Sequence, residues 1–174
     1  MSDAKNTRPL RLYGCVDDSI VDGPGVRLAI FTQGCSRQCP GCHNPESQPY
    51  DTGYPATIDS LMDMVDANPL LTGVTLSGGE PFDQAEALIP FVVRLHVEKP
   101  LLSLWAYSGY LFEELCAGVP SAEALGLLEL LDVLVDSPYI ESLRSLDLLW
   151  KGSENQRIID VPASLQSGKA IIMG

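Results

Sequence analysis

Three closely spaced cysteines constrain this chain more than any other feature. Cys35, Cys39 and Cys42 form a C-x3-C-x2-C pattern, which lets one short loop direct three thiolates at a single inorganic centre. Four thiolates would complete the protein ligands of a cubane iron–sulfur cluster, as in ferredoxins, whereas three leave one iron open to a small molecule. The pattern therefore favours chemistry at an iron–sulfur centre.

Other interpretations of the same loop stay open. The three thiols together with His43 could bind a structural zinc ion as a Cys3His set. Residues 39–43 also match C-x-x-C-H, the attachment pattern of c-type haem, although Cys35 would then have no role. Cys39 and Cys42 could exchange thiol and disulfide, which again leaves Cys35 unexplained. A non-enzymatic zinc module or an iron–sulfur electron carrier is therefore the alternative class of function.

The cysteine count also indicates a cellular compartment. The chain has five cysteines, an odd number with three in one loop, which argues for metal binding in a reducing compartment and against a disulfide framework. We expect Cys15 and Cys116 to be small buried side chains. The polar start of the chain does not resemble a secretory signal, and no apolar run is long enough to span a bilayer, so we expect a cytoplasmic protein without membrane contact.

The charge of the chain limits its partners. It has 23 acidic and 11 basic residues, giving a net charge of −12. Such a surface repels a phosphate backbone, so we expect no binding to nucleic acid. A basic region on a protein partner is compatible with this charge.

Strand-like apolar runs alternate with helical patterns, and no linker or repeat interrupts them. The expected strands are residues 26–32, 73–77, 101–107 and 132–136. The expected helices are residues 57–68, 83–99 and 139–150, with further helical segments within residues 110–131. The last helix is expected from the spacing of Ile140, Leu143, Leu146 and Leu149. This alternation predicts an α/β fold, a parallel sheet with helical crossovers. Residues 1–9 are expected to be a polar tail, and residues 10–174 a single domain.

Polar motifs occur where the expected strands end. Loops at the carboxyl ends of parallel strands are where α/β proteins gather their sites. The cysteine loop, residues 77–81, residues 108–109 and Asp136 all occupy such positions. In the Ser77-Gly78-Gly79-Glu80-Pro81 segment the paired glycines allow close approach of the main chain to a ligand, and Glu80 adds a carboxylate. Beside the cysteine loop, we expect this segment to bind a cationic amino group.

These two motifs, in this order, resemble those of the radical S-adenosylmethionine enzymes. The resemblance implies an incomplete TIM-type barrel and a [4Fe–4S] cluster whose open iron binds S-adenosylmethionine. One electron from the cluster would then cleave this cofactor to methionine and a 5′-deoxyadenosyl radical. The implied iron ligands are Cys35, Cys39 and Cys42, and the implied cofactor contacts are Gly41, Cys42, His43, Ser77, Gly78, Gly79 and Glu80. Many of these enzymes have an aromatic residue where this chain has Gly41, so the adenine contacts are not predicted.

Three further segments resemble a narrower group. Residues 21–27 (VDGPGVR) and 42–45 (CHNP) are similar to those of glycyl-radical enzyme activases, and residues 150–160 (WKGSENQRIID) to those of activating proteins of anaerobic (class III) ribonucleotide reductase. The resemblance implies hydrogen abstraction from a glycine of the reductase catalytic subunit, with electrons from a flavodoxin- or ferredoxin-like donor. It places Asp22 near the partner's glycine loop. Asp136 could bind ribose or a monovalent cation, or make a structural hydrogen bond. Activation of pyruvate formate-lyase or another glycyl-radical enzyme is the alternative.

Overall fold

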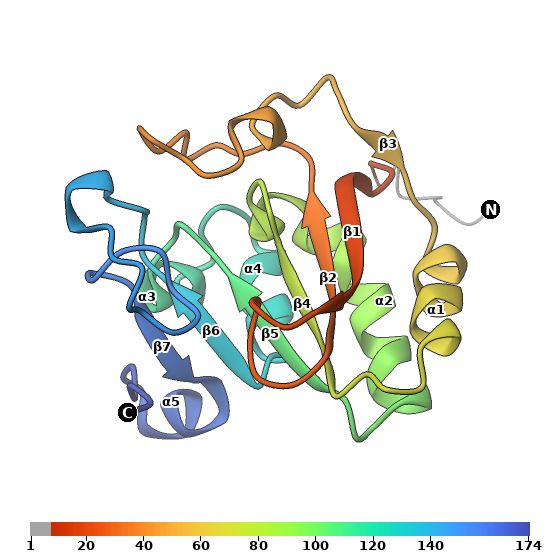
Figure 1. The fold of residues 1–174 in the computed structure, drawn as a ribbon. Coiled ribbons are helices and arrows are strands. Elements are labelled where there is room, and N and C mark those ends of the chain that lie inside the picture. Colours follow the sequence, from red (N-terminus) through yellow and green to blue (C-terminus); the bar gives the residue numbers. More distant parts are fainter. Residues whose placement is uncertain (1–7) are drawn as a thin grey trace.

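The computed structural model describes residues 8–174, so most of the tail expected at residues 1–9 lies outside the described residues. A seven-stranded sheet with the order β3-β1-β2-β4-β5-β6-β7 forms the centre of the fold (Figure 1). Its strands are β1 (Arg11–Ser19), β2 (Arg27–Thr32), β3 (Tyr54–Pro55), β4 (Gly73–Gly78), β5 (Ser103–Tyr107), β6 (Val133–Asp136) and β7 (Arg157–Asp160). The expected parallel arrangement is confirmed for β2, β4, β5 and β6. β1, β3 and β7 add antiparallel edges.

Helices connect the parallel strands. The α-helices are α1 (Ile58–Ala67), α2 (Ala85–Glu98), α3 (Phe112–Cys116), α4 (Glu123–Leu128) and α5 (Val161–Ser167), and the short 3-10 helices are η1 (Pro45–Ser47), η2 (Pro81–Gln84) and η3 (Glu141–Leu143). α1 begins after Thr57, whose side chain accepts a hydrogen bond from the Ser60 N–H, as a capping residue should. α2 continues through Pro90. Among residues 8–174, no helix combines the length and the apolar character needed to cross a membrane.

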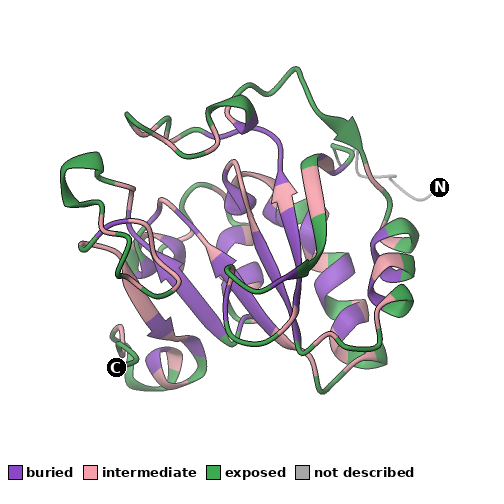
Figure 2. Ribbon diagram, in the orientation of Figure 1, coloured by how far each residue is buried: buried purple, intermediate pink, exposed green. Residues whose placement is uncertain are grey.

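Successive side chains of the central strands point to opposite faces of the sheet, and only one of these faces carries the main core. One side of the sheet packs against α1, α2 and α4, through a core that includes Leu28, Ile30, Val74, Leu76, Leu104 and Leu134. Cys15 and Cys116 are only partly buried against this core, less than expected. On the other side, Trp105, Val133 and Val135 form a smaller cluster. Figure 2 shows the buried central strands and the exposed loops around them. The pleat thus leaves one sheet face available for a site.

The prediction of a helix at residues 139–150 is wrong. Only η3 is helical there, and Leu146 and Leu149 are 86% and 69% exposed. These two leucine side chains, although spaced three residues apart as on one helix face, therefore do not pack on an apolar surface. The backbone is held by a neighbouring turn instead, because the Glu154 N–H donates to the Leu143 carbonyl (2.9 Å) and the Ile140 N–H to the Ser153 hydroxyl (3.2 Å). We call residues 137–156 the C-terminal wall.

Candidate cofactor site

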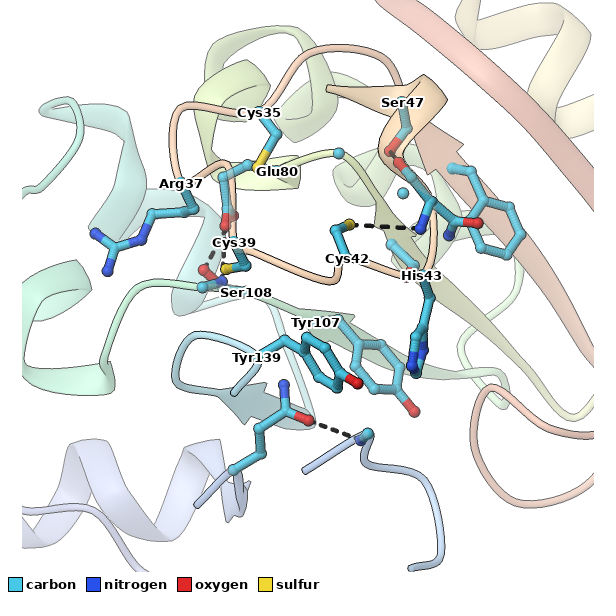
Figure 3. A pocket seen from close by; sticks show the side chains of 18 of the residues that line it. Cys35, Arg37, Cys39, Cys42, His43, Ser47, Glu80, Tyr107, Ser108 and Tyr139 are labelled. Atoms are coloured by element: carbon cyan, nitrogen blue, oxygen red, sulfur yellow. Dashed lines mark hydrogen bonds between the residues drawn. The ribbon is translucent and has the colours of Figure 1, made fainter. Parts of the chain in front are cut away.

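A cavity of about 370 Å³ lies at the carboxyl ends of the parallel strands. Figure 3 shows the cysteine loop (residues 34–43) on one side of it and the aromatic side chains of Tyr107 and Tyr139 on another. The expected residues that line this cavity are Asp22, Cys35, Cys39, Cys42, His43, Ser77, Gly78, Gly79 and Glu80. The fold thus brings together motifs from separate parts of the sequence.

The cysteine loop is held in place through its main chain. The Gly34 N–H donates to the Ser47 carbonyl (2.7 Å), and the Cys35 N–H donates to the Gln48 carbonyl (3.0 Å). Both bonds attach the start of the loop to η1 and the residue after it. The position of the first thiol is therefore set by backbone hydrogen bonds, which a change of side chain would leave intact.

Asp83 also holds the cysteine loop in place, through its side chain. Its carboxylate accepts hydrogen bonds from the Ser36 N–H (2.8 Å) and from the hydroxyls of Ser36 (3.0 Å), Tyr50 (2.7 Å) and Tyr110 (3.2 Å). One carboxylate thus joins the cysteine loop, η2 and the segment after β5. Sequence analysis missed this residue, although its place three positions after Glu80 at a strand end was an available signal.

Gly79 allows the end of β4 to touch the cysteine loop. The Gly79 N–H donates to the Thr32 carbonyl (2.8 Å), and the Glu80 N–H donates to the Gly34 carbonyl (2.9 Å). A Cβ atom at Gly79 would lie 2.2 Å from the Gly34 carbonyl oxygen, closer than any side chain tolerates. Close approach between two backbones explains why glycine stands here.

Glu80 is buried and fully engaged. Its carboxylate accepts hydrogen bonds from the Ser108 hydroxyl (2.9 Å), the Gly109 N–H (2.8 Å) and the Phe82 N–H (3.1 Å). Burial raises its pKa to about 8, against the opposing effect of the two backbone N–H groups. The side chain therefore couples the ends of β4 and β5 and places a titratable group at the cavity.

The three thiols suit an iron–sulfur cluster. All three line the cavity; Cys35 is buried and the others are partly exposed. Soft thiolate ligands of this kind bind iron–sulfur clusters or zinc. Burial raises the pKa of the Cys35 thiol, and N–H groups of Gln38 and Arg37 oppose the rise. Within residues 8–174, no three His, Cys, Asp or Glu side chains are grouped closely enough to hold one ion.

The His43 ring does not join the thiols as a fourth ligand. It packs against Tyr139, with ring centroids 4.7 Å apart and planes tilted by 55°. This placement gives no support to the Cys3His zinc site. Sequence analysis also missed Tyr139, because it lies in the segment that was expected to be a helix.

Gly41 and Asp136 lie outside the cavity lining, unlike the other expected residues. Gly41 has φ of +74°, and a Cβ there would lie 2.6 Å from the Glu141 carboxyl carbon. Asp136 is fully buried, and its carboxylate accepts hydrogen bonds from the Phe112 N–H (2.7 Å) and from Nε (2.9 Å) and Nη2 (2.5 Å) of Arg157. These hydrogen bonds agree with the structural alternative expected for Asp136, and its contact with a cofactor stays a prediction.

Asp22 lies at the cavity, on the loop between β1 and β2. Its carboxylate accepts a hydrogen bond from the Ser19 hydroxyl, and its carbonyl accepts one from the Thr75 hydroxyl (2.7 Å). The same Thr75 oxygen accepts a hydrogen bond from Nε of the buried Arg27 (2.7 Å). Asp22 is therefore held over the face of the sheet that the helices leave free.

The chain is similar in sequence to several known proteins. The chain matches the family described as "4Fe-4S single cluster domain" over residues 21–159. The anaerobic ribonucleoside-triphosphate reductase-activating protein of Salmonella typhimurium is 34% identical over 143 residues, 79% of this chain and 90% of the relative. The protein of that name from Enterobacteria phage T4 is 30% identical over 152 residues, 85% of this chain and 90% of the relative. The crystal structure of QueE from Escherichia coli aligns with a TM-score of 0.44 and 16% identity, over 58% of this chain and 53% of QueE.

Proposed function

The chain belongs to the 4Fe-4S single cluster domain family and to the anaerobic ribonucleoside-triphosphate reductase-activating proteins, and on this premise we propose how its residues act. It is a radical S-adenosylmethionine enzyme with a [4Fe–4S] cluster. One observation carries the proposal: the three thiols and the Gly78-Gly79-Glu80 turn line the same cavity. One cavity thus contains both the expected ligands of a cluster with an open iron and the expected site for an amino group.

The protein residues bind and orient, while the cofactors supply the reactivity. Cys35, Cys39 and Cys42 would hold three irons of the cluster. A cluster held there would supply the one electron needed to cleave S-adenosylmethionine to methionine and a 5′-deoxyadenosyl radical. The turn at Gly78 and Gly79 receives the methionine end, because both residues line the cavity together with the three thiols. Glu80 adds a carboxylate that three hydrogen bonds hold in one orientation.

The glycine loop of the reductase catalytic subunit enters beside Asp22. The loop between β1 and β2 contributes Val21 and Asp22 to the cavity and exposes Ile20 and Val21 (each 72%). Leu146 and Leu149 of the C-terminal wall are also exposed. A protein segment that covered these apolar side chains would exclude water from a reactive carbon radical. The net charge of −12 favours a basic region around that segment.

The proposal also includes the type of barrel, the electron donor and the cellular compartment. We interpret the sheet as an incomplete TIM-type barrel within a single domain of residues 10–174, since strands β2, β4, β5 and β6 share one main core. A flavodoxin- or ferredoxin-like protein supplies the electron, and neither nucleic acid nor membrane takes part. Free thiols at the cavity support a reducing cytoplasmic setting. The comparisons favour the ribonucleotide reductase over pyruvate formate-lyase as partner, because the relatives carry its name.

Anaerobic reconstitution tests the proposal. The protein is loaded with iron and sulfide, S-adenosylmethionine and a strong reductant are added, and 5′-deoxyadenosine is measured with and without the reductase. We expect 5′-deoxyadenosine together with a glycyl radical signal on the reductase. Cleavage without that signal would reassign the partner. A fully loaded cluster that cleaves no cofactor would contradict the proposed function and favour an electron carrier.

A further inference from the structure

We propose that Asp83 is a positioning residue for the iron–sulfur cluster: its carboxylate holds the Cys35 end of the cysteine loop, and its negative charge lowers the reduction potential of the cluster. This inference rests on the proposed function, because it concerns the cluster that the three thiols would hold. It starts from η2, whose side chains contact the chain on both sides of Cys35. A group in such a place acts on a cluster through its ligands and need not touch it.

Two neighbouring side chains of η2 hold the chain before and after Cys35. Before it, Nε2 of Gln84 donates a hydrogen bond to the Gln33 carbonyl (3.0 Å). After it, the Asp83 carboxylate accepts hydrogen bonds from the Ser36 N–H (2.8 Å) and from the Ser36 hydroxyl (3.0 Å). The position of the first thiol is therefore set from both sides, and only the contact after it uses an acidic side chain.

The Asp83 carboxylate accepts hydrogen bonds at both of its oxygens. Oδ2 accepts from the Ser36 N–H and from the Tyr50 hydroxyl (2.7 Å), and Oδ1 accepts from the hydroxyls of Ser36 and Tyr110 (3.2 Å). An ionised carboxylate can accept all of these bonds, whereas a protonated one would have to turn a partner into an acceptor. Burial and the Asp83 carboxylate raise the pKa of the Tyr50 hydroxyl, which keeps it in its donor form. The pattern therefore favours the charged form of Asp83.

No cation of the described residues neutralises this carboxylate. The ion pairs found within residues 8–174 do not include Asp83. The guanidinium of Arg37 lies over the Tyr110 ring, 4.8 Å from its centroid, and Figure 3 shows it directed away from the three thiols. A neutral amide could also accept hydrogen bonds at this place, so hydrogen bonding alone does not account for a carboxylate. The negative charge itself therefore has a role beside the thiols.

This charge suits the reaction that the proposed function requires. Reduction adds one negative charge to a cluster, so a nearby carboxylate disfavours the reduced state and lowers the reduction potential. A cluster with a lower potential is a stronger reductant toward the sulfonium of S-adenosylmethionine. A fully satisfied hydrogen-bond network is also rigid, which keeps the cysteine loop in one shape when the charge of the cluster changes.

A redox titration tests the role of the charge. Wild type and Asp83→Asn are reconstituted anaerobically with iron and sulfide, and the reduced cluster is followed by electron paramagnetic resonance without S-adenosylmethionine. We expect a more positive potential in Asp83→Asn, by about tenfold in the equilibrium constant for reduction, or about 59 mV for one electron. Asp51→Asn is the matched control, because Asp51 follows Tyr50 but is exposed, so that solvent and salt screen its charge. Its potential should match that of wild type.

Tyr50→Phe separates the charge from the hydrogen bonds. This variant keeps the ring that lies against Gly34 and removes one donor to the Asp83 carboxylate, which leaves the charge less neutralised. We expect its potential to shift in the opposite direction from that of Asp83→Asn, to a more negative value. A positive shift in Tyr50→Phe as large as that in Asp83→Asn would show that lost hydrogen bonds set the potential, and would overturn the role of the charge.

Iron release to a chelator tests the hold on the cysteine loop. Asp83→Ala removes every hydrogen bond between this side chain and Ser36, Tyr50 and Tyr110. We expect the reconstituted variant to release iron several-fold faster than wild type, because the chain after Cys35 loses its anchor. Equal rates of release would show that Asp83 does not hold the loop.

The outcomes for wild type separate this inference from the proposed function. If wild type holds no redox-active [4Fe–4S] cluster, the proposed function fails first. If wild type and Asp83→Asn hold equal amounts of iron and have the same potential, the role of the Asp83 charge is wrong although the function stands. If Asp83→Asn binds too little cluster to titrate, Tyr50→Phe decides: a more negative potential supports the role of the charge, and an unchanged or more positive one contradicts it.

Discussion

The Ser108 hydroxyl donates a hydrogen bond to the Glu80 carboxylate at 2.9 Å, and this contact joins the ends of two neighbouring parallel strands below the cofactor cavity. The Gly109 N–H donates to the other carboxylate oxygen (2.8 Å). A glutamate that sequence analysis assigned to ligand binding alone is therefore also a structural link. Its protonation state affects the structural role, because a buried carboxyl group whose pKa differs between the folded and unfolded states changes the stability of the fold with pH.

Glu80→Gln should remove a pH dependence of folding. Burial raises the pKa of Glu80 from 4.5 to about 8 in the folded protein. Between these values the folded protein holds a proton that the unfolded chain has released, so the free energy of unfolding falls as pH rises. Urea denaturation of the cofactor-free protein from about pH 5 to about pH 9 measures this slope. The variant should show a flatter profile, and exposed Glu86→Gln should match wild type. Equal slopes for wild type and Glu80→Gln would contradict the shift.

Sequence analysis predicted the parts of the site that are local in the chain. The cysteine loop and the Ser77-to-Glu80 turn were found because each is a short motif at a strand end, and α/β topology brings strand ends together. Asp83 and Tyr139 were missed because their roles arise from contacts across the fold. The helix expected at residues 139–150 failed for a related reason: apolar spacing indicates a helical face only if some surface covers it, and here Leu146 and Leu149 are exposed.

Cys39→Ala should prevent assembly of a complete cluster. Three thiols supply all the protein ligands in this proposal, so the loss of one leaves a second iron without protein support. Iron and sulfide content after anaerobic reconstitution should fall well below that of wild type. Cys116→Ala is the control, because Cys116 is a part-buried residue on α3 away from the cavity lining. Full iron content in Cys39→Ala would show that another group can take its place.

Asp22→Asn should separate the two halves of the reaction. Asp22 lies on the loop beside the partner's proposed path, whereas the cluster ligands and the Gly78-Gly79 turn belong to other segments. We expect 5′-deoxyadenosine formation without the reductase to stay within about twofold of wild type, and glycyl radical yield on the reductase to fall about tenfold or more. Asp18→Asn, on the exposed part of β1, is the control. Equal losses in both measurements would show that Asp22 serves cofactor cleavage instead.

Arg157→Gln should destabilise the protein through Asp136. The Asp136 carboxylate is fully buried, and two of its hydrogen bonds come from the Arg157 guanidinium. Removing one partner of such a pair leaves a buried charge without compensation, which costs about 3–5 kcal/mol. The free energy of unfolding of the cofactor-free protein measures this loss. Glu113→Gln is the informative comparison, because Glu113 binds the same guanidinium (2.8 Å) from the surface, with its side chain 55% exposed.

The surface contact of Glu113 should matter far less than the buried one. Exposed ion pairs contribute about 0–1 kcal/mol, so Glu113→Gln should remain close to wild type in stability. Asp136→Asn should lie between the two variants, because an amide can still accept from the Phe112 N–H but cannot neutralise Arg157. If Asp136 served the cofactor instead of the fold, Asp136→Asn would keep its stability and lose affinity for S-adenosylmethionine. That pattern would reverse the structural role assigned here, whereas a stability loss with unchanged affinity would support it.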